Sequence, residues 1–154
     1  MNLQGYCYTL TDADRQLASV IASKQHASSG ARGTRGAGSN HDFRFKGVLG
    51  EIVVARILGI SPQVDDFGGP TSRPDIILVD GTAIEVKYGL PMEGKSKLRP
   101  TAYYAVVCES DQGENVYCIS RYRKGEDILR DGIEPPQWMC PRPGTRELNW
   151  LISA

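Results

Sequence analysis

The chain has 154 residues, of which 40% are apolar and 23% charged, with 18 basic and 18 acidic side chains. This length suffices for one hydrophobic core and is too short for two ordinary domains, so we expect a single domain over residues 1–154. No apolar run approaches the roughly 20 residues that span a bilayer, and the N-terminus lacks an export signal, which argues against a membrane protein and predicts a cytoplasmic one.

A short helix and a glycine-rich loop are the first predicted elements. Thr11 is a good helix N-cap, and apolar residues recur at helical spacing through about Lys24. Residues 27–42 are rich in glycine and hold no large apolar side chain, so we expect a mobile loop there. Its two arginines, Arg32 and Arg35, leave two interpretations open: a solvated linker, or a flap that closes over phosphates.

The remaining elements predict an α/β fold. Residues 43–59 are dense in apolar side chains and end on a glycine suited to a C-cap, which is typical of a central helix. Short runs rich in β-branched and aromatic residues predict strands at 63–67, 75–79, 82–88, 102–108 and 115–120. A short helix is predicted over 123–131, and the last eight residues are compatible with a terminal helix. This order predicts a central mixed β-sheet of about five strands flanked by helices.

The four cysteines, Cys7, Cys108, Cys118 and Cys140, are scattered without a C-x-x-C pair. Two of them lie in apolar strand-like segments, where a reduced thiol behaves as a small hydrophobe. We therefore expect buried free thiols, and an iron–sulfur cluster built from one early and three late cysteines is the alternative.

Residues 73–89 place Asp75, Glu85 and Lys87 in an otherwise apolar hairpin. A two-residue turn would put the two carboxylates on opposite faces of the sheet. A three-residue turn that ends in a left-handed Gly81 would instead place Asp75 directly opposite Glu85, with Cβ atoms about 5 Å apart. Lys87 would then point the same way.

Two facing carboxylates repel each other unless a cation or a proton lies between them. Hard divalent ions prefer oxygen ligands, so the three-residue turn predicts a metal site at Asp75 and Glu85. An ordinary hairpin with a cross-strand Asp–Lys ion pair is the alternative. Glu51 adds a third acid, because it lies in an apolar stripe of the central helix where an unpaired charge would be unfavourable. Gly47 and Gly50 predict that this helix approaches the sheet or a phosphate closely.

Three parts of the sequence resemble the PD-(D/E)XK nuclease superfamily: Glu51 on the first core helix, Pro74-Asp75 opening a strand, and Glu85-Val86-Lys87 on the next. The resemblance covers about residues 43–88 and implies a restriction-endonuclease-like core. It also implies a Mg²⁺-dependent phosphodiesterase, with Mn²⁺ as a substitute, that leaves 5′-phosphate and 3′-hydroxyl ends. On this resemblance Asp75, Glu85 and the Val86 backbone carbonyl would bind the metal. Lys87 would position or help deprotonate the attacking water and stabilise charge on the phosphorane, and Glu51 would bind a metal-held water or a second ion.

Within this superfamily, "KGVLGE" and "FGGPTSRPDI" are similar to a helix and a loop of archaeal-type Holliday junction resolvases. The expected activity is that of a DNA endonuclease acting on double-stranded or branched DNA, and a homodimer is one option because one short chain has one active site. An RNA substrate and a non-cleaving nucleic-acid-binding module with the same fold are alternatives. Phosphate contacts are predicted for the basic side chains near these motifs. They are Arg32, Arg35, Arg44, Lys46, Arg73, Lys95, Lys97 and Arg99.

Overall fold

The computed structural model describes residues 1–29, 40–63, 73–88 and 98–131. The elements in chain order are β1 (Cys7–Thr9), α1 (Asp12–Ser29), α2 (Asn40–Leu58), β2 (Ile76–Ile77), β3 (Ala83–Tyr88), β4 (Tyr103–Glu109), β5 (Val116–Lys124) and α3 (Gly125–Asp131). The strands form one sheet in the order β1-β5-β4-β3-β2. β3 and β4 run parallel, and the other neighbouring pairs run antiparallel. The prediction of an α/β fold with a five-stranded mixed sheet is confirmed.

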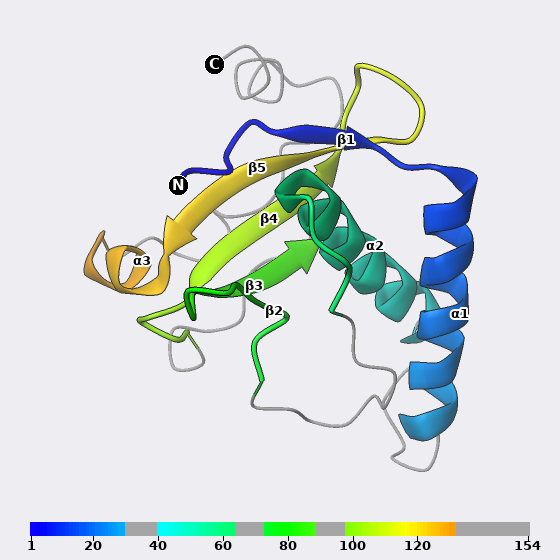
Figure 1. Cartoon of the computed structure of the whole chain (residues 1–154), viewed down its shortest axis with the longest axis horizontal. Helices are drawn as coiled ribbons and strands as arrows, with labels where there is room; N and C mark the ends of the chain where they lie inside the picture. The colour runs from blue at the N-terminus through cyan, green and yellow to red at the C-terminus, as the bar shows by residue number, and fades with distance from the viewer. Residues whose placement is uncertain (30–39, 64–72, 89–97, 132–154) are drawn as a thin grey trace.

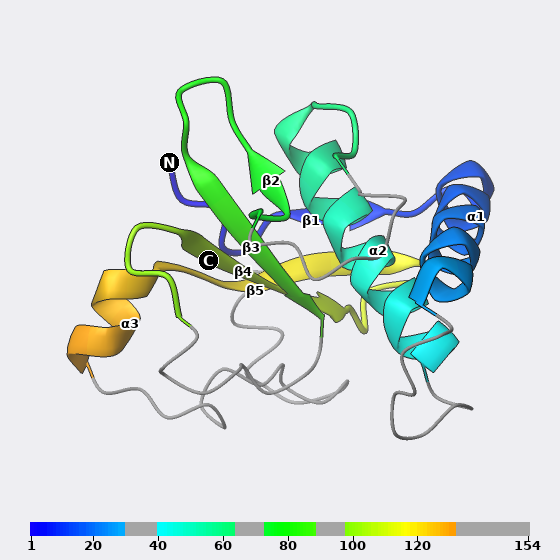
Figure 2. The same cartoon turned by 90° about the horizontal axis from the view of Figure 1, so that it is seen from below.

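Helix α2 lies across one face of this sheet, and α1 packs against α2 (Figure 1). The main core lies between α2 and the sheet and includes Leu49, Ile52, Val53, Ile84 and Ile119, all at most 2% exposed. The helix α3 lies at the end of the molecule far from α1 (Figure 2). A smaller cluster on the opposite face joins α3 to the sheet. It consists of Ala102, Tyr104, Val106 and Ile128.

The N-terminus of α1 is closed by a reciprocal pair of hydrogen bonds, in agreement with the predicted Thr11 cap. The Asp14 N–H donates to Thr11 Oγ1 at 3.1 Å, and the Thr11 N–H donates to Asp14 Oδ2 at 3.2 Å. The same buried carboxylate accepts from the Tyr8 hydroxyl at 2.8 Å and from Arg56 Nε at 3.1 Å. Asp14 thus ties α1 to β1 and to the last turn of α2.

Both helices are longer than the sequence predicts. Helix α1 runs to Ser29 and α2 begins at Asn40, so the predicted loop over 27–42 is wrong at both ends, and residues 30–39 lie outside the described part of the chain. Helices α1 and α2 pack against each other, and tertiary packing stabilises helices beyond what sequence propensity alone predicts. The predicted end of α2 is confirmed, because Gly59 adopts a φ of 71° and closes a Schellman motif.

The predicted strands over 82–88 and 102–108 agree with β3 and β4 to within one residue, whereas the predicted strand over 75–79 is limited to Ile76–Ile77 in β2. β1 is missed by the sequence patterns, and the predicted strand over 63–67 lies outside the described residues from position 64 onward. β5 continues past residue 120 to Lys124, where it pairs with Tyr103 of β4, so the following helix starts at Gly125 rather than at residue 123.

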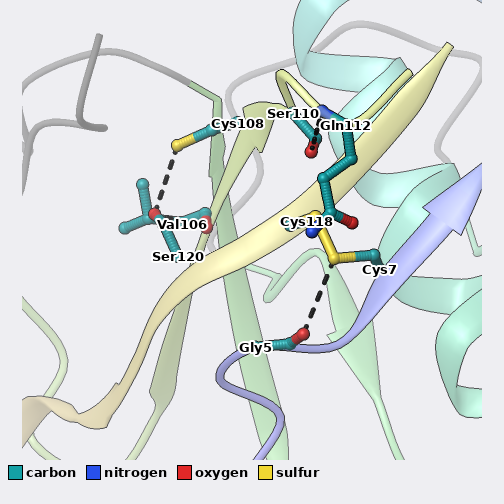
Figure 3. Close-up of a disulfide and its surroundings, with 8 residues drawn as sticks. All are labelled: Gly5, Cys7, Val106, Cys108, Ser110, Gln112, Cys118 and Ser120. Carbon is teal, nitrogen blue, oxygen red and sulfur yellow. Dashed lines mark hydrogen bonds between the residues drawn. A yellow bond between two sulfur atoms is a disulfide. The ribbon is translucent and has the colours of Figure 1, made fainter. Parts of the chain in front are cut away.

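A disulfide joins Cys7 of β1 to Cys118 of β5 (Figure 3). The two residues lie directly opposite each other in the antiparallel pair of β1 and β5. Cys108 is disulfide-bonded as well, so none of the three described cysteines is a free thiol. The prediction of buried free thiols is therefore wrong for Cys7 and Cys118, because β1, which the sequence patterns miss, brings Cys7 against its partner. It is wrong for Cys108 too. Cys140 lies outside the described residues. Disulfides are rare in reducing compartments, so the cytoplasmic location stays a prediction without support from this feature.

The helices of the described part of the chain include none that is both long enough and apolar enough to cross a bilayer.

Candidate metal centre

The β2–β3 hairpin has the register of the three-residue turn. Ile76 lies opposite Ile84, and Gly81 closes the turn with a φ of 86°, a conformation that glycine adopts without strain. One step further along this register, Asp75 lies opposite Glu85. The predicted turn is thus confirmed, and so is the placement of both carboxylates on one face of the hairpin.

The opposite face of the hairpin is anchored in the main core. Its apolar side chains are Ile76, Leu78, Ile84, Val86 and Tyr88. Because side chains alternate along a strand, Glu85 and Lys87 point to the other face, where Tyr104 and Val106 of β4 are their register partners. The core therefore determines on which side of the sheet the two charged residues of β3 emerge.

The two carboxyl groups are in contact and partly buried. Asp75 Oδ2 accepts a hydrogen bond of 2.8 Å from the Val86 N–H, and the Asp75 and Glu85 side chains lie close enough for each to shift the pKa of the other. The Glu85 side chain is only 12% exposed, and within the described structure its Oε1 atom has no hydrogen-bond partner. Arg99 Nη1 lies 3.4 Å from that oxygen, which is an ion-pair contact without hydrogen-bond geometry.

Burial raises the pKa of both carboxyl groups. For Glu85 the neighbouring Asp75 charge raises the pKa further, whereas Arg99 and Lys87 act to lower it. For Asp75 the Val86 N–H and the charge of Lys87 oppose the effect of burial, and the pKa is raised on balance. Two facing carboxyl groups repel each other when both are ionised, and a shared proton is one way to relieve that repulsion.

A divalent metal ion could relieve the same repulsion. The residues present fit Mg²⁺ or Mn²⁺, because carboxylate oxygens are the donors these ions prefer and Glu85 Oε1 is a buried acceptor with no hydrogen-bond donor in the described structure. Asp75 and Glu85 would be the protein ligands. The contribution of the Val86 carbonyl stays a prediction.

Glu51 is not brought into one group with these two acids. Within the described ranges no three or more His, Cys, Asp or Glu side chains lie close enough together to hold one ion. Glu51 is partly exposed on α2, next to Gly50. A Cβ atom at Gly50 would lie 3.2 Å from Val86 Cγ1, so the predicted close approach of helix and sheet is confirmed there. A Cβ at Gly47 meets no described atom within 4 Å, so contact with the described sheet does not explain that glycine.

Among the basic residues predicted to contact phosphates, Arg99 forms an ion-pair contact with Glu85 of the carboxyl pair. Lys87 also acts electrostatically on both carboxyl groups. Arg73 is exposed two residues before Asp75, and Arg44 and Lys46 lie on the first half of α2. The other four predicted residues lie outside the described part of the chain. They are Arg32, Arg35, Lys95 and Lys97.

Sequence patterns did not reveal two supporting side chains. The Tyr104 hydroxyl accepts a hydrogen bond of 2.8 Å from the Arg99 N–H and so holds this residue near Glu85. The side-chain amide of Gln63 makes two hydrogen bonds, of 2.9 and 3.0 Å, to the backbone of Ile77 on β2. Both contacts depend on tertiary placement, and no local pattern in the sequence signals them.

A separate hollow of about 310 Å³ lies at the turn between β4 and β5. Its lining includes Arg15, Glu109, Asn115 and Tyr117. Arg15 is already engaged there, because its Nε donates to Asn115 Oδ1 at 2.9 Å and its Nη2 donates to the Tyr117 hydroxyl at 3.1 Å. None of the predicted site residues lines this hollow.

The structure thus brings together Asp75, Glu85, Lys87 and Arg99, and it leaves Glu51 outside that group. Comparisons of the chain with protein-family models, with curated proteins and with solved structures found no match. Its function must therefore be inferred from the chemistry of the hairpin and its surroundings.

Proposed function

We propose that this chain is a Mg²⁺-dependent DNA endonuclease of the PD-(D/E)XK type. The observation that carries the proposal is the contact between the Asp75 and Glu85 carboxyl groups, with a buried Glu85 oxygen that lacks a hydrogen-bond partner in the described structure. Lys87 stands beside them and completes the Asp, Glu-x-Lys set. Two partly buried carboxyl groups repel each other when both are ionised, so a purely structural hairpin gains nothing from this pair.

The arrangement of the surrounding elements supports the proposal. The resemblance implies a core of a helix, three strands, a helix and a strand. Of that pattern, the described residues supply α2, β2, β3 and β4 in the expected order, and β4 runs parallel to β3 as a crossover connection requires. The second helix of the pattern would lie between β3 and β4, where residues 89–97 are outside the described part of the chain. The predicted first strand of the three, over 63–67, falls outside the described residues from position 64 onward.

In the proposed reaction, a water oxygen attacks phosphorus, the bond to the 3′ oxygen breaks, and that oxygen takes up a proton. The products are a 5′-phosphate and a 3′-hydroxyl. A bound Mg²⁺ ion supplies Lewis-acid stabilisation of the phosphoryl oxygens. Asp75 and Glu85 would hold the ion from the hairpin that the main core anchors. The compact ammonium group of Lys87 orients the attacking water and stabilises charge that develops in the transition state.

The second candidate is a nucleic-acid-binding module that does not cleave. The separation of Glu51 from the carboxyl pair favours this candidate, because fewer acidic ligands bind a metal less tightly. The two candidates share the binding surface and differ in whether Asp75 and Glu85 support turnover.

The assay that tests the proposal uses the full chain with supercoiled, linear and branched DNA, with Mg²⁺ or with excess chelator. Asp75→Asn is the active-site variant. Asp80→Asn is the matched control, because Asp80 is an exposed carboxylate in the turn of the same hairpin. We expect cleavage by the wild type and by Asp80→Asn in Mg²⁺ only, and a loss of at least 100-fold in Asp75→Asn.

Labelled product ends should be 5′-phosphates, and a preference for branched substrate would support the resolvase-like form. Cleavage in chelator, or an equal rate in Asp75→Asn and Asp80→Asn, would contradict the metal mechanism. DNA binding without any cleavage in Mg²⁺ or Mn²⁺ would favour the non-cleaving module.

A further inference from the structure

The Arg99 side chain occupies the position beside Glu85 that a metal ion bound by Glu85 would need. Its Nη1 atom is 3.4 Å from Glu85 Oε1, the same buried oxygen that lacks a hydrogen-bond partner within the described structure. The contact therefore depends on charge rather than on a directed hydrogen bond. Such a contact holds the guanidinium near the oxygen and leaves it easy to displace.

The backbone of Arg99, in contrast, is held firmly. Its N–H donates to the Tyr104 hydroxyl at 2.8 Å, and its carbonyl accepts from the Ala102 N–H at 3.2 Å. The start of α3 also packs directly on it, because a Cβ atom at Gly125 would lie 2.0 Å from the Arg99 carbonyl oxygen. Meanwhile the Arg99 side chain is 36% exposed. An anchored backbone with a partly exposed, loosely held side chain suits a group that changes partners.

We propose that Arg99 gates the metal site: in the metal-free protein it neutralises Glu85, and on metal binding it turns to the phosphodiester held at the site. This inference rests on the proposed function. A divalent cation bound by Glu85 repels the guanidinium, which then needs another anion. A phosphate is the partner that the planar guanidinium fork matches best.

The gate couples the binding of metal to the binding of DNA. Without DNA, metal must displace Arg99 and therefore binds less tightly than the two carboxylates alone would allow. With DNA, the displaced guanidinium gains a phosphate, so each ligand strengthens the binding of the other. Removal of the guanidinium should raise the affinity for metal alone and reduce the coupling.

Calorimetric titration of the full chain with Mn²⁺, without DNA, measures the first effect. We expect Arg99→Gln, which keeps most of the side-chain length, and Arg99→Ala both to bind Mn²⁺ about 3- to 10-fold more tightly than the wild type. Arg130→Ala is the matched control, because Arg130 is exposed on α3 and forms ion pairs with Asp127 and Asp131. Its affinity for Mn²⁺ should equal that of the wild type, and Asp75→Asn should lose binding.

The second effect is measured in a Lys87→Ala background, which prevents turnover while DNA binds. Fluorescence anisotropy of a labelled duplex with and without Mn²⁺ should show a gain in DNA affinity that Arg99→Gln largely removes. The log–log salt dependence measured with Mn²⁺ should lose about one unit of slope in that variant.

The two proposals fail in different ways. If neither the wild type nor Arg99→Gln binds Mn²⁺, the metal centre itself is wrong. If the wild type binds Mn²⁺ but Arg99→Gln and Arg99→Ala bind with unchanged affinity and keep the Mn²⁺-dependent gain in DNA affinity, the gate is overturned while the proposed nuclease stands.

Discussion

Two buried acidic centres of this chain differ in how their charge is satisfied. Asp14, only 2% exposed, accepts hydrogen bonds from Tyr8, Thr11 and Arg56. Glu85 keeps a buried oxygen without a hydrogen bond in the described structure and lies against a second carboxyl group. A buried carboxylate whose oxygens all have hydrogen-bond partners is expected where the group stabilises the fold. A pair of carboxyl groups with an oxygen that lacks a partner is expected where a ligand supplies the missing contact.

The hydrogen bonds of Asp14 should contribute to the free energy of unfolding and to the change of that free energy with pH. Burial alone would raise the pKa of Asp14, but its hydrogen bonds outweigh burial and lower the pKa. The contribution of a carboxylate with a lowered pKa is present above its unfolded pKa near 4, and it is lost as pH falls through the folded value. We therefore expect Asp14→Ala to lose about 2–3 kcal/mol of unfolding free energy at pH 7. The unfolding free energy of this variant should also fall less steeply than that of the wild type as the pH is lowered.

Urea denaturation between pH 7 and pH 3 measures both effects. Asp12→Ala is the control, because Asp12 is an exposed acid in the same first turn and interacts only weakly with the helix dipole. Equal losses in Asp12→Ala and Asp14→Ala would show that the Asp14 network contributes no more than an exposed charge.

At the scale of elements, locally encoded features could be predicted and those that need distant partners could not. The Gly81 turn, the Thr11 cap and the Gly59 end of α2 each depend on a few neighbouring residues, and all three are confirmed. β1 has three residues and depends on pairing with β5, so no local pattern indicates it. The contact of Arg99 with Glu85 likewise depends on where the crossover between two parallel strands returns.

Two glycines of α2 provide a matched pair for testing how the helix meets the sheet. Alanine is favoured over glycine in a helix by about 1 kcal/mol. At Gly47 a Cβ meets no described atom within 4 Å, so we expect Gly47→Ala to stabilise the protein by about 0.5–1 kcal/mol. At Gly50 the Cβ would lie 3.2 Å from Val86 Cγ1, so the gain should be cancelled or reversed. Equal stabilisation of both variants in urea denaturation would contradict the close approach.

For the whole molecule, the Cys7–Cys118 disulfide and the carboxyl pair are expected to act independently. The disulfide joins the edge strand β1 to β5, whereas Asp75 precedes β2 at the other edge of the sheet. Sequence could not predict this link, because it joins residues 111 positions apart through a strand too short to recognise. The sheet order thus separates the disulfide from the proposed metal site.

Removal of the disulfide should therefore lower stability and spare the site. A cross-link over 111 residues constrains the unfolded chain strongly, so we expect the Cys7→Ser, Cys118→Ser double variant to lose about 4 kcal/mol. Thermal unfolding measures this loss, and a Mn²⁺ titration at a temperature where the variant is folded should give the wild-type affinity. An unchanged Tm would refute the stabilising role, and a lost metal site would refute the independence.

The central claim is that Asp75 and Glu85 bind one divalent ion between them, and anomalous diffraction from crystals grown with Mn²⁺ tests it most directly. The account predicts a single strong peak between the two carboxylates, with metal–oxygen distances of about 2.1 Å and the Arg99 side chain turned away from Glu85. The account is contradicted if saturating Mn²⁺ leaves no peak between the two carboxyl groups and the Arg99 side chain still lies against Glu85.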